Sequence, residues 1–441
     1  MHRGAHFAFR RNPELRRHTL GSENAGALAM EVHPSSSEPR GTRTATAARL
    51  MTRFAARTGL ISSGPRRRYL WTDAFAVCNF LGLARATGEG YYRELALDLV
   101  ESVHHELGRH RRDDRRFPGC ISGLSDEDGD DHPTYGGLRI GKPFPERDAE
   151  VPLDADLEWE RDGQYFHYLT KWMHALDQTA CATGDLKYHL WARELAVVAH
   201  RAFSYGPPHA RRMAWKLSID LSRPLVAVMG QHDPLDGFVT CAELDATSTE
   251  LDVPREPSLA DASADFASML EHASFATDDP LGIGGLLFDA MRLVQAGADR
   301  PLVAALLEAA VIGLRHYLSN PDLRSPAEAR LGFRELGLAI GLAAIPILAT
   351  PPVVDELDAA ARATLTELSD YLPLRTEIEA FWLDPDHQKA RSWKDHEDID
   401  DVMLATSLVP HEFLVLTPSA SATGSRFGVL GRQERRPGGS W

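Results

Sequence analysis

The feature that most constrains the fold of this chain is a helical hairpin that occurs more than once. The tetrapeptide Ala-Thr-Gly-Glu at 86–89 recurs 96 residues later as Ala-Thr-Gly-Asp at 182–185, and the match continues into the residues that follow. Each copy has the pattern of a helix, a tight glycine-containing turn and a second helix. Because one hairpin cannot bury its apolar faces alone, the repeat indicates a stack of several hairpins.

The two helices of a hairpin differ in how their apolar residues are distributed. Residues 70–86 are apolar on nearly every side, which is typical of a helix that is buried all round. Residues 90–108 carry a single apolar stripe that includes Leu95, Leu99 and Val103, which is typical of a helix with one wet face. We therefore expect the first helix of each pair in an inner layer and the second in an outer layer.

The same alternation along the chain predicts six inner helices and hence an all-α (α/α)6 barrel, a six-hairpin toroid. Strand patterns are nearly absent, so no sheet larger than a small hairpin or two is expected. The inner helices are expected to begin near residues 71, 164, 215, 280, 332 and 397. The outer helices are expected at 90–108, 186–204, 236–246, 301–318 and 353–371, with an additional outer-layer helix at 258–275.

The chain divides into three segments of different character. Residues 1–57 are rich in Arg and show little periodicity, so we expect a disordered N-terminal extension. A transit-like peptide, or a true start at Met51, is an alternative for this segment. Residues 66–415 are expected to form the catalytic-type (α/α)6 domain. Residues 418–441 are rich in Gly, Ser and Arg and are expected to be a disordered tail.

Composition excludes several classes of function. The formal net charge of −15 argues against a nucleic-acid binder and against a protein that adheres to anionic membranes. Four cysteines without CxxC spacing favour a reduced, cytoplasmic and soluble protein, and no apolar run is long enough to span a membrane. The chain has no glycine-rich phosphate loop, GxSxG elbow or HExxH motif, and we expect neither a metal nor another cofactor.

Polar and aromatic side chains collect where the predicted inner helices begin. Parallel inner helices open their N-termini on one face, so these side chains are expected to converge, most of them around one cavity. The candidates for acid–base catalysis are Asp73, Glu160, Asp220, Glu335, His396 and Glu397. The candidates for substrate binding are Trp71, Trp159, Tyr165, His167, Lys171, Trp215, Lys216 and Trp393. Trp and Tyr faces stack on sugar rings, whereas carboxylates hydrogen-bond hydroxyl groups.

Each candidate also has a structural interpretation. Asp73 can cap a helix, Lys216 and Asp220 can simply form an ion pair with each other, and the tryptophans can belong to the core. The segment Gln-His-Asp-Pro-Leu-Asp-Gly at 231–237 has the look of a motif. The predicted helices place it on the face opposite the pocket, so we interpret it as structural.

The chain resembles the six-hairpin glycosidase superfamily over residues 66–415. The resemblance is carried by the hairpin repeat and by the segments YLWTDAFAVCNFL at 69–81, DGQYFHYLTKWMHAL at 162–176 and WKLSIDLSRPLV at 215–226. It implies a toroid, a small-molecule or oligosaccharide substrate and the paired carboxylates of a glycoside hydrolase. Two alternatives stay open. One is an isomerase resembling the N-acylglucosamine 2-epimerases, in which His396 and His167 would move protons. The other is a non-catalytic protein that binds a glycan or a partner.

Overall fold

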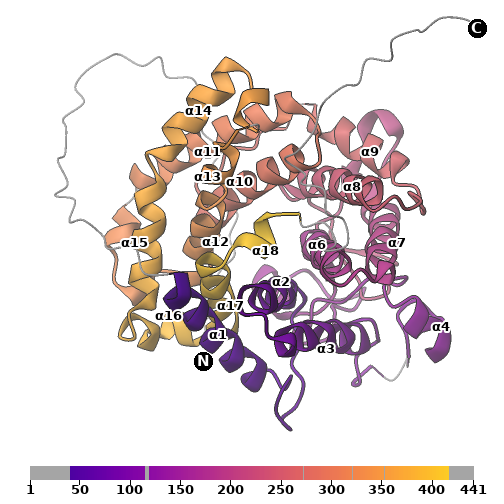
Figure 1. Ribbon diagram of the computed structural model, residues 1–441. Coiled ribbons are helices and arrows are strands. Elements are labelled where there is room, and N and C mark those ends of the chain that lie inside the picture. Colours follow the sequence, from indigo (N-terminus) through magenta and orange to yellow (C-terminus); the bar gives the residue numbers. More distant parts are fainter. Residues whose placement is uncertain (1–39, 115–118, 272, 320, 352, 417–441) are drawn as a thin grey trace, which may run out of the picture.

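Six helices form a closed inner ring in the computed structural model, which describes residues 40–114, 119–271, 273–319, 321–351 and 353–416. Each helix of the ring contacts the next, and the last contacts the first (Figure 1). In ring order they are α2 (Leu70–Thr87), α6 (Phe166–Thr183), α8 (Asp233–Glu250), α10 (Pro280–Gln295), α12 (Gly332–Leu342) and α17 (Glu397–Leu408). The predicted (α/α)6 barrel is confirmed.

An outer layer of helices completes the hairpins. The pairs are α3 (Gly90–Leu107) on α2, α7 (Leu186–Phe203) on α6, α9 (Ala260–Leu270) on α8, α11 (Arg300–Ser319) on α10, α15 (Leu372–Leu383) on α12 and α1 (Arg40–Arg57) on α17. A further outer helix, α14 (Ala359–Ser369), packs on α11. By length and composition α11 passes the test for a membrane span, but half of that stretch is buried against the other helices.

The repeated hairpins end their inner helices in the same way. Gly88 after α2 and Gly184 after α6 both adopt the left-handed conformation, with φ of 75° and 74°. Glycine takes this conformation without the steric cost that a Cβ atom would bring, so the chain reverses at once into the outer helix. The predicted hairpin repeat is thereby confirmed.

The remaining elements are short. Five further helices are α4 (Asp126–Asp131), α5 (Ala155–Glu160), α13 (Ile345–Leu348), α16 (Arg391–Lys394) and α18 (His411–Leu414). The 3-10 turns are Pro208–Ala210, Pro321–Arg324, Ala327–Ala329, Val354–Glu356 and His387–Lys389. The strands are β1 (Gln164–Tyr165), β2 (Ser204–Tyr205), β3 (Arg212–Met213), β4 (Lys216–Leu217) and β5 (Pro224–Val226). They pair antiparallel in the orders β1-β4-β5 and β2-β3, in keeping with the predicted lack of any larger sheet.

The third hairpin differs from the prediction. Residues 215–229 form no helix, because they contribute β4 and β5, and the inner helix α8 begins only at Asp233. The apolar residues Leu217, Ile219 and Leu221 alternate with polar ones, which is the period of a strand, and Pro224 lacks the N–H that a helix interior needs. The predicted outer helix at 236–246 is therefore part of the inner ring, and the helix expected at 258–275 is its outer partner, α9.

The expectation of disorder over 1–57 is wrong for residues 40–57, which form α1. Leu50, Met51 and Phe54 of α1 are buried against the ring. Arg53 Nη2 and Arg57 Nη2 contact the two oxygens of the buried Asp401 in α17, at 2.6 and 2.8 Å. Helix α1 is thus the outer partner of the sixth inner helix. Residues 1–39 and the predicted tail at 418–441 lie outside the described residues.

A short C-terminal segment plugs the ring. The ring of Phe413 in α18 lies between Phe75 and Phe288 of opposite inner helices, stacked at 4.3 Å from each. Gln178 and Gln295, near the last turns of α6 and α10, donate to the carbonyls of the plug. Figure 1 shows α18 at the centre of the ring. The plug therefore closes the lumen toward the C-terminal ends of the inner helices.

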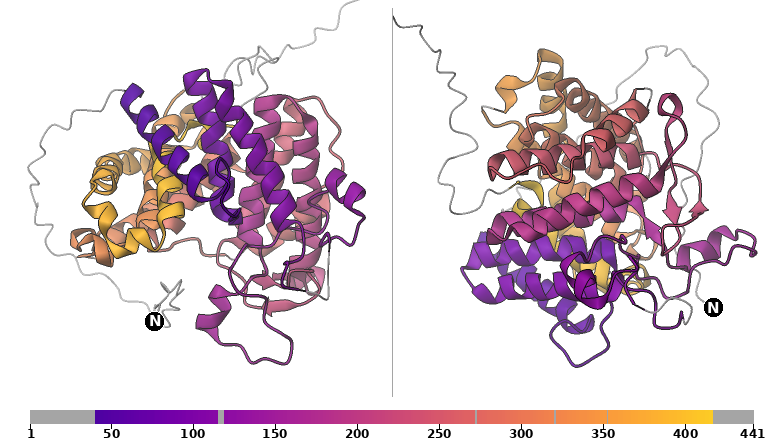
Figure 2. Two further views of the ribbon diagram at one scale, coloured as in Figure 1. Left: turned by 90° about the horizontal axis from the view of Figure 1, so that it is seen from below. Right: turned by 90° about the vertical axis from the view of Figure 1, so that its right-hand side faces the viewer.

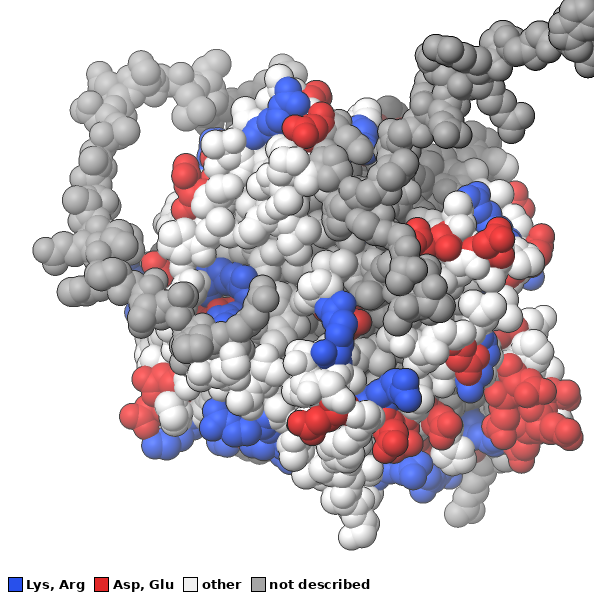
Figure 3. All heavy atoms as spheres, in the orientation of Figure 1, with Lys and Arg blue, Asp and Glu red and all other residues white. Residues whose placement is uncertain are grey.

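Long connections gather at the other end of the ring, where the inner helices begin. Figure 2 shows the loops between α3 and α6 and the short strands extending beyond one end of the helices. On the opposite, plugged face, carboxylates concentrate over α4, and basic side chains are scattered (Figure 3). The loop-bearing end, here called the mouth, is where the predicted site residues were expected to converge.

Candidate functional site

Aromatic side chains form a continuous wall at the mouth. Trp71 lies 6.5 Å from Tyr168, which contacts Tyr165 at 5.2 Å between ring centroids. Tyr165 in turn packs on Trp215 at 4.9 Å, and Trp159 meets Trp215 edge-on at 4.8 Å. These five residues, here called the mouth aromatics, come from α2, α5, β1, α6 and the β3–β4 segment. Burial raises the pKa of Tyr168 to about 12, so its hydroxyl stays protonated at neutral pH.

Two charged contacts join α6 to α8 beside this wall. Nδ1 of His167 lies 3.5 Å from Oδ1 of Asp233, and Nζ of Lys171 lies 2.7 Å from Oδ1 of Asp236. His167 also stacks on Tyr165, and its side chain keeps 28% of its exposure. The second carboxylate oxygen of Asp233 is buried without a hydrogen-bond partner in the described part of the chain. An acceptor in this state is a candidate for a hydroxyl group supplied by a ligand.

Asp236 and a second carboxyl, Asp289 of α10, differ in protonation at neutral pH. Burial and, to a smaller extent, the nearby Asp236 carboxylate raise the pKa of Asp289 to about 7 against the pull of Lys171 and Arg292. Burial also acts on Asp236, but Lys171, His167 and Arg292 together outweigh it and lower the pKa of Asp236. One carboxyl therefore holds a proton near neutral pH while its neighbour is ionised.

Below these groups a buried ionic network connects the site to the plug. Arg292 pairs with Glu243, and His174 contacts the same carboxylate at 2.8 Å through Nδ1. Burial would raise the pKa of Glu243, but Arg292 and His174 lower it to about 2. The other ring nitrogen of His174 lies 3.0 Å from the carbonyl oxygen of Phe413. The floor of the site is thus fixed by charges that are already paired.

The predicted placement of residues 231–237 on the face opposite the pocket is wrong. This segment opens the inner helix α8 at the mouth and supplies Asp233 and Asp236. The error arose because residues 215–229 were expected to form the third inner helix. The true inner helix, α8, was therefore taken for its outer partner. Asp289 and Arg292 were also missed, although two charges within the apolar run of residues 286–294 are a signal of an inward-facing polar network.

Six of the predicted binding residues do gather at the mouth. They are Trp71, Trp159, Tyr165, His167, Lys171 and Trp215. Their grouping follows from the first turns of α2 and α6 and from the pairing of β1 with β4, in which Tyr165 faces Lys216. Their roles toward a ligand stay predictions.

Lys216 and Asp220 lie near this group but do not share a cavity with it. The Lys216 ammonium is fully buried and donates to Oε1 and the carbonyl of Glu158 and to the carbonyl of Arg161, at 2.7–2.9 Å. Asp220 is exposed at a loop tip, where it accepts hydrogen bonds from Ser218 and Ser222. The prediction of one shared cavity is wrong for both residues, because each is committed to holding its own loop.

Glu335 and Trp393 also make their contacts within the ring of helices rather than with the mouth aromatics. Both oxygens of Glu335 pair with Arg330, at 2.8 and 2.6 Å, and one also accepts from the indole of Trp382 at 2.8 Å. Trp393 is buried and stacks on Trp382 at 5.4 Å. The expectation that Glu335 points into the common cavity is therefore wrong.

This placement predicts that Glu335→Gln destabilises the protein. The change would leave the buried Arg330 guanidinium without its bidentate partner, which typically costs about 3–5 kcal/mol. Urea unfolding monitored by circular dichroism measures the loss. Asp220→Asn is the matched control and should change the free energy of unfolding by less than about 0.5 kcal/mol, because the site is exposed. Equal stability of the two variants would contradict the assignment.

Asp73 and Glu160 flank the wall on the side of α2. Asp73 is buried, accepts from the backbone N–H of Tyr69 at 2.9 Å, and lies 3.4 Å from Arg68. Burial raises its pKa to about 6, with both contacts acting in the opposite direction. The capping interpretation thus has a basis in the structure. Glu160 is half-buried at the end of α5 and helps to raise the pKa of Tyr69, for which burial is the main cause.

His396 and Glu397 begin α17 away from these contacts. Nδ1 of His396 lies 2.9 Å from the carbonyl oxygen of Ser392, and its ring packs on Phe333 at 5.4 Å. Glu397 accepts from Lys394 at 3.0 Å and lies 3.8 Å from Arg57. Both side chains therefore contribute to the start of α17, and their predicted catalytic roles are not tested by these contacts.

A Ser-His-Asp arrangement occurs elsewhere but is sealed in the core. Nε2 of His189 lies 2.8 Å from Oγ of Ser248, and Nδ1 lies 2.7 Å from Oδ1 of Asp177. All three side chains are buried, and Oγ of Ser248 also accepts from Arg193 at 3.1 Å. A nucleophile needs access to its substrate, so we interpret this trio as a structural network that joins α6, α7 and α8.

Comparisons with known proteins agree with the fold but identify no family. No family model matches the sequence, and no curated protein sequence matches it. A solved GH76A α-1,6-mannanase from Salegentibacter matches with 12% identity over 84% of this chain and 99% of its own, at a TM-score of 0.49. A GH76 α-mannanase from Bacteroides thetaiotaomicron matches with 8% identity over 86% of this chain and 97% of its own, at a TM-score of 0.49. An inactive double-aspartate variant of the Salegentibacter enzyme, which also matches, is solved with α-1,6-mannotetrose. Matches at these identities and TM-scores carry no conclusion about the family or the activity of this chain.

Proposed function

We propose that this protein is a glycoside hydrolase that acts on an oligosaccharide at the mouth of the toroid. The observation that carries the proposal is the pair formed by Asp236 and Asp289, whose pKa values are displaced in opposite directions. Glycosidic bond hydrolysis requires one carboxyl that gives a proton and one that is ionised. Environments that separate the pKa values of two neighbouring carboxyls supply that combination at one pH.

In this mechanism Asp289 is the general acid. Its proton is retained at neutral pH because the side chain is buried on α10, and it would pass to the oxygen of the leaving sugar. Asp236 stays ionised through Lys171 and would activate a water or stabilise the positive charge that develops on the sugar ring. Asp233 and His167 lie at the entrance to this pair and would bind sugar hydroxyls.

The mouth aromatics support a saccharide as the ligand. Flat apolar faces of Trp and Tyr suit the C–H faces of sugar rings, and neighbouring polar groups take up the hydroxyls. Trp159 and Trp215 are half-buried, so parts of their rings remain available to a ligand. The epimerase alternative depends on His167 and His396, of which His396 has its Nδ1 bonded to the carbonyl oxygen of Ser392, and the alternative of a binding protein predicts no acid with a displaced pKa.

A substrate panel tests the proposal. The protein is incubated with neutral and acidic oligosaccharides, including the α-1,6-mannotetrose bound by one structural neighbour, and the products are separated by chromatography and mass spectrometry. Shorter sugars are the expected result. Products of unchanged mass with altered configuration would establish the epimerase instead. Saturable binding without any product would establish a glycan-binding protein and overturn the proposal.

A further inference from the structure

A cavity of about 650 Å³ opens beside the mouth, between the segment that precedes α2, the last turn of α3 and the loop that follows α3. Half of its ten lining residues are cationic, in a protein whose formal net charge is −15. These residues are Arg66, Arg111, Arg112, Arg139 and Lys142. A second cavity of about 520 Å³ shares three of these arginines, so positive charge continues across both.

The cations of the cavity fall into two groups, according to whether their N–H donors are already bonded to other residues of the protein. Arg111 donates to both oxygens of Asp113, to Asp162 and to the carbonyls of Lys142 and Pro143, so its five N–H groups are occupied. It is therefore part of the frame of the cavity.

Two more arginines use only some of their N–H donors in bonds to the described residues. Arg112 pairs with Glu106 at 2.9 Å. Arg139 makes three bonds, to the buried Asp162 and to the carbonyls of Glu106 and Arg109. A guanidinium has five N–H groups, so two of those on Arg139 have no acceptor among the described residues and are open to a ligand, in an orientation that Asp162 fixes.

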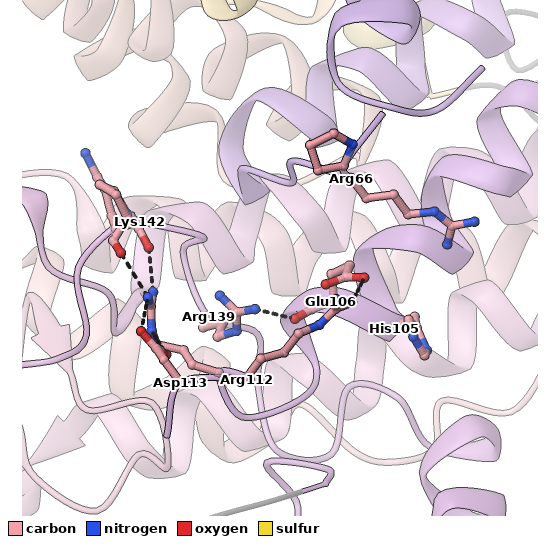
Figure 4. Close-up of a pocket in the computed structure, with 10 residues that line it drawn as sticks. Arg66, His105, Glu106, Arg112, Asp113, Arg139 and Lys142 are labelled. Carbon is pink, nitrogen blue, oxygen red and sulfur yellow. Dashed lines mark hydrogen bonds and ion pairs between the residues drawn. The ribbon is translucent and has the colours of Figure 1, made fainter. Parts of the chain in front are cut away.

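Arg66 and Lys142 have no carboxylate or carbonyl acceptor among the described residues. Figure 4 shows Arg66 and His105 on one side of the cavity, Lys142 on the other and Arg139 between them. The Lys142 ammonium lies 5.4 Å from the centre of the Tyr69 ring, and its side chain is half-buried. Glu160 and Asp162 act on the Lys142 ammonium from a distance, but they do not occupy its N–H donors, which can therefore bind an anion.

A chain of ring contacts connects this cavity to the mouth. The Tyr69 ring that lies under Lys142 has its hydroxyl 2.6 Å from the hydroxyl of Tyr168. Tyr168 meets His167 edge-on at 4.9 Å, and His167 is the neighbour of Asp233. The cations and the carboxylates therefore lie on either side of the same aromatic residues.

We propose that the cavity binds the acidic group of a saccharide, a carboxylate, sulfate or phosphate, whose sugar rings lie along the mouth aromatics. Arg66, Arg139 and Lys142 would take up the negative charge. The saccharide part of this inference rests on the proposed function and narrows its substrates to acidic sugars. The charge on the ligand rests on the cavity alone.

Isothermal titration calorimetry with four matched probes tests the inference. Glucuronate and glucose 6-phosphate carry the acid on a sugar, glucose is the neutral counterpart and inorganic phosphate lacks the sugar. We expect both acidic sugars to bind at least about tenfold more tightly than glucose, as one charge-assisted contact would give. The difference should shrink at 0.5 M NaCl. Phosphate alone should bind more weakly than glucose 6-phosphate.

Variants locate the binding. Arg66→Gln combined with Lys142→Gln should remove the preference for acidic sugars. Arg49→Gln, on the exposed side of α1 with only a bond to Thr46, is the matched control and should keep it. Equal affinity for glucose and glucuronate, or a preference that persists in the double variant, would overturn the inference. So would phosphate that binds as tightly as glucose 6-phosphate, because the site would then recognise the anion without the sugar.

The experiments distinguish failure of the proposed glycosidase function from failure of the proposed acidic subsite. Hydrolysis of neutral oligosaccharides without binding of acidic probes would sustain the glycosidase and refute the acidic subsite. Tight, salt-dependent binding of glucuronate without turnover of any saccharide would sustain the subsite and refute the glycosidase.

Discussion

Replacing Asp289 by Asn should lower the rate of glycoside hydrolysis by about 10³-fold or more, because a positioned general acid contributes typically 10²–10⁴-fold. Asn resembles the protonated acid in shape but gives no proton to the leaving oxygen. The rate is measured on the oligosaccharide that the substrate panel identifies, by product release. Asp236→Asn should cause a loss of similar size, because it removes the carboxylate that Lys171 keeps ionised.

Asp289→Asn should also change the stability of the protein in a way that distinguishes loss of the acid from a folding defect. The folded-state pKa of Asp289, about 7, lies above the ordinary value of 3.8, so the folded protein holds this proton more tightly than the unfolded chain. The contribution of this group to the free energy of unfolding is therefore fully present below pH 3.8, declines as the pH rises from there to about 7, and is lost above that pH. The melting temperature of Asp289→Asn should therefore exceed that of the wild type by less at pH 5 than at pH 8.

The acid role also predicts the pH profile of turnover. Hydrolysis by the wild type should fall above pH 7, where Asp289 loses its proton, and should persist on the acid side because the pKa of Asp236 is lowered. Asp220→Asn is the control and should leave both the rate and the profile unchanged. Full turnover by both Asp236→Asn and Asp289→Asn would exclude this pair as the catalytic carboxyls.

Deleting residues 1–57 should prevent the protein from folding to a stable ring. The deletion removes α1 and exposes the face of α17 that Leu50, Met51 and Phe54 cover. It also leaves the buried Asp401 without Arg53 and Arg57, which by itself costs about 3–5 kcal/mol. Together these losses are comparable to the 5–15 kcal/mol of a typical folded protein. Calorimetry should show no cooperative unfolding transition.

Deletion of residues 1–39 is the matched control, because it leaves α1 whole. This shorter protein should unfold cooperatively at a temperature close to that of the full chain. A protein without residues 1–57 that melts within a few degrees of the control would show that α1 is dispensable.

The ring was predictable from the sequence because its hairpins repeat a local pattern. Six inner helices and glycine turns such as Gly88 and Gly184 follow from periodicity and from one conformational property of glycine. Helix α1 was not recognised because its Arg-rich composition masks the apolar positions at 50, 51 and 54, which matter only once α17 is beside them. Pairing between the two ends of a chain leaves no local signal.

The candidate site was predictable only in part. Trp71, Tyr165 and Tyr168 stand directly before or within the first turns of α2 and α6, and their convergence follows from the parallel inner helices, whereas Trp215 joins them through a strand segment that was predicted to be a helix. The carboxyls Asp233 and Asp236 depended on the register of the third hairpin, which one misassigned segment changed, whereas Asp289 stood in an apolar run whose two charges were overlooked. Glu335 and Lys216 have the composition of site residues, yet their partners Arg330 and Glu158 take up their charges. Only the three-dimensional arrangement separates a paired charge from an available one.

The way the chain ends meet has a consequence for the time course of folding. Helix α1 contacts α17 through pairs such as Arg53 and Asp401, which are 348 residues apart, and the plug contacts α2 and α10 from residues 411–416. Contacts of such long sequence separation form slowly, because the loop they close must first be ordered. During synthesis the five central hairpins would emerge as an open arc whose two edges stay exposed until residue 416 has left the ribosome. In that interval a second arc can supply the missing helix, so we expect misassembly of this protein to proceed by exchange of α1 between nascent chains.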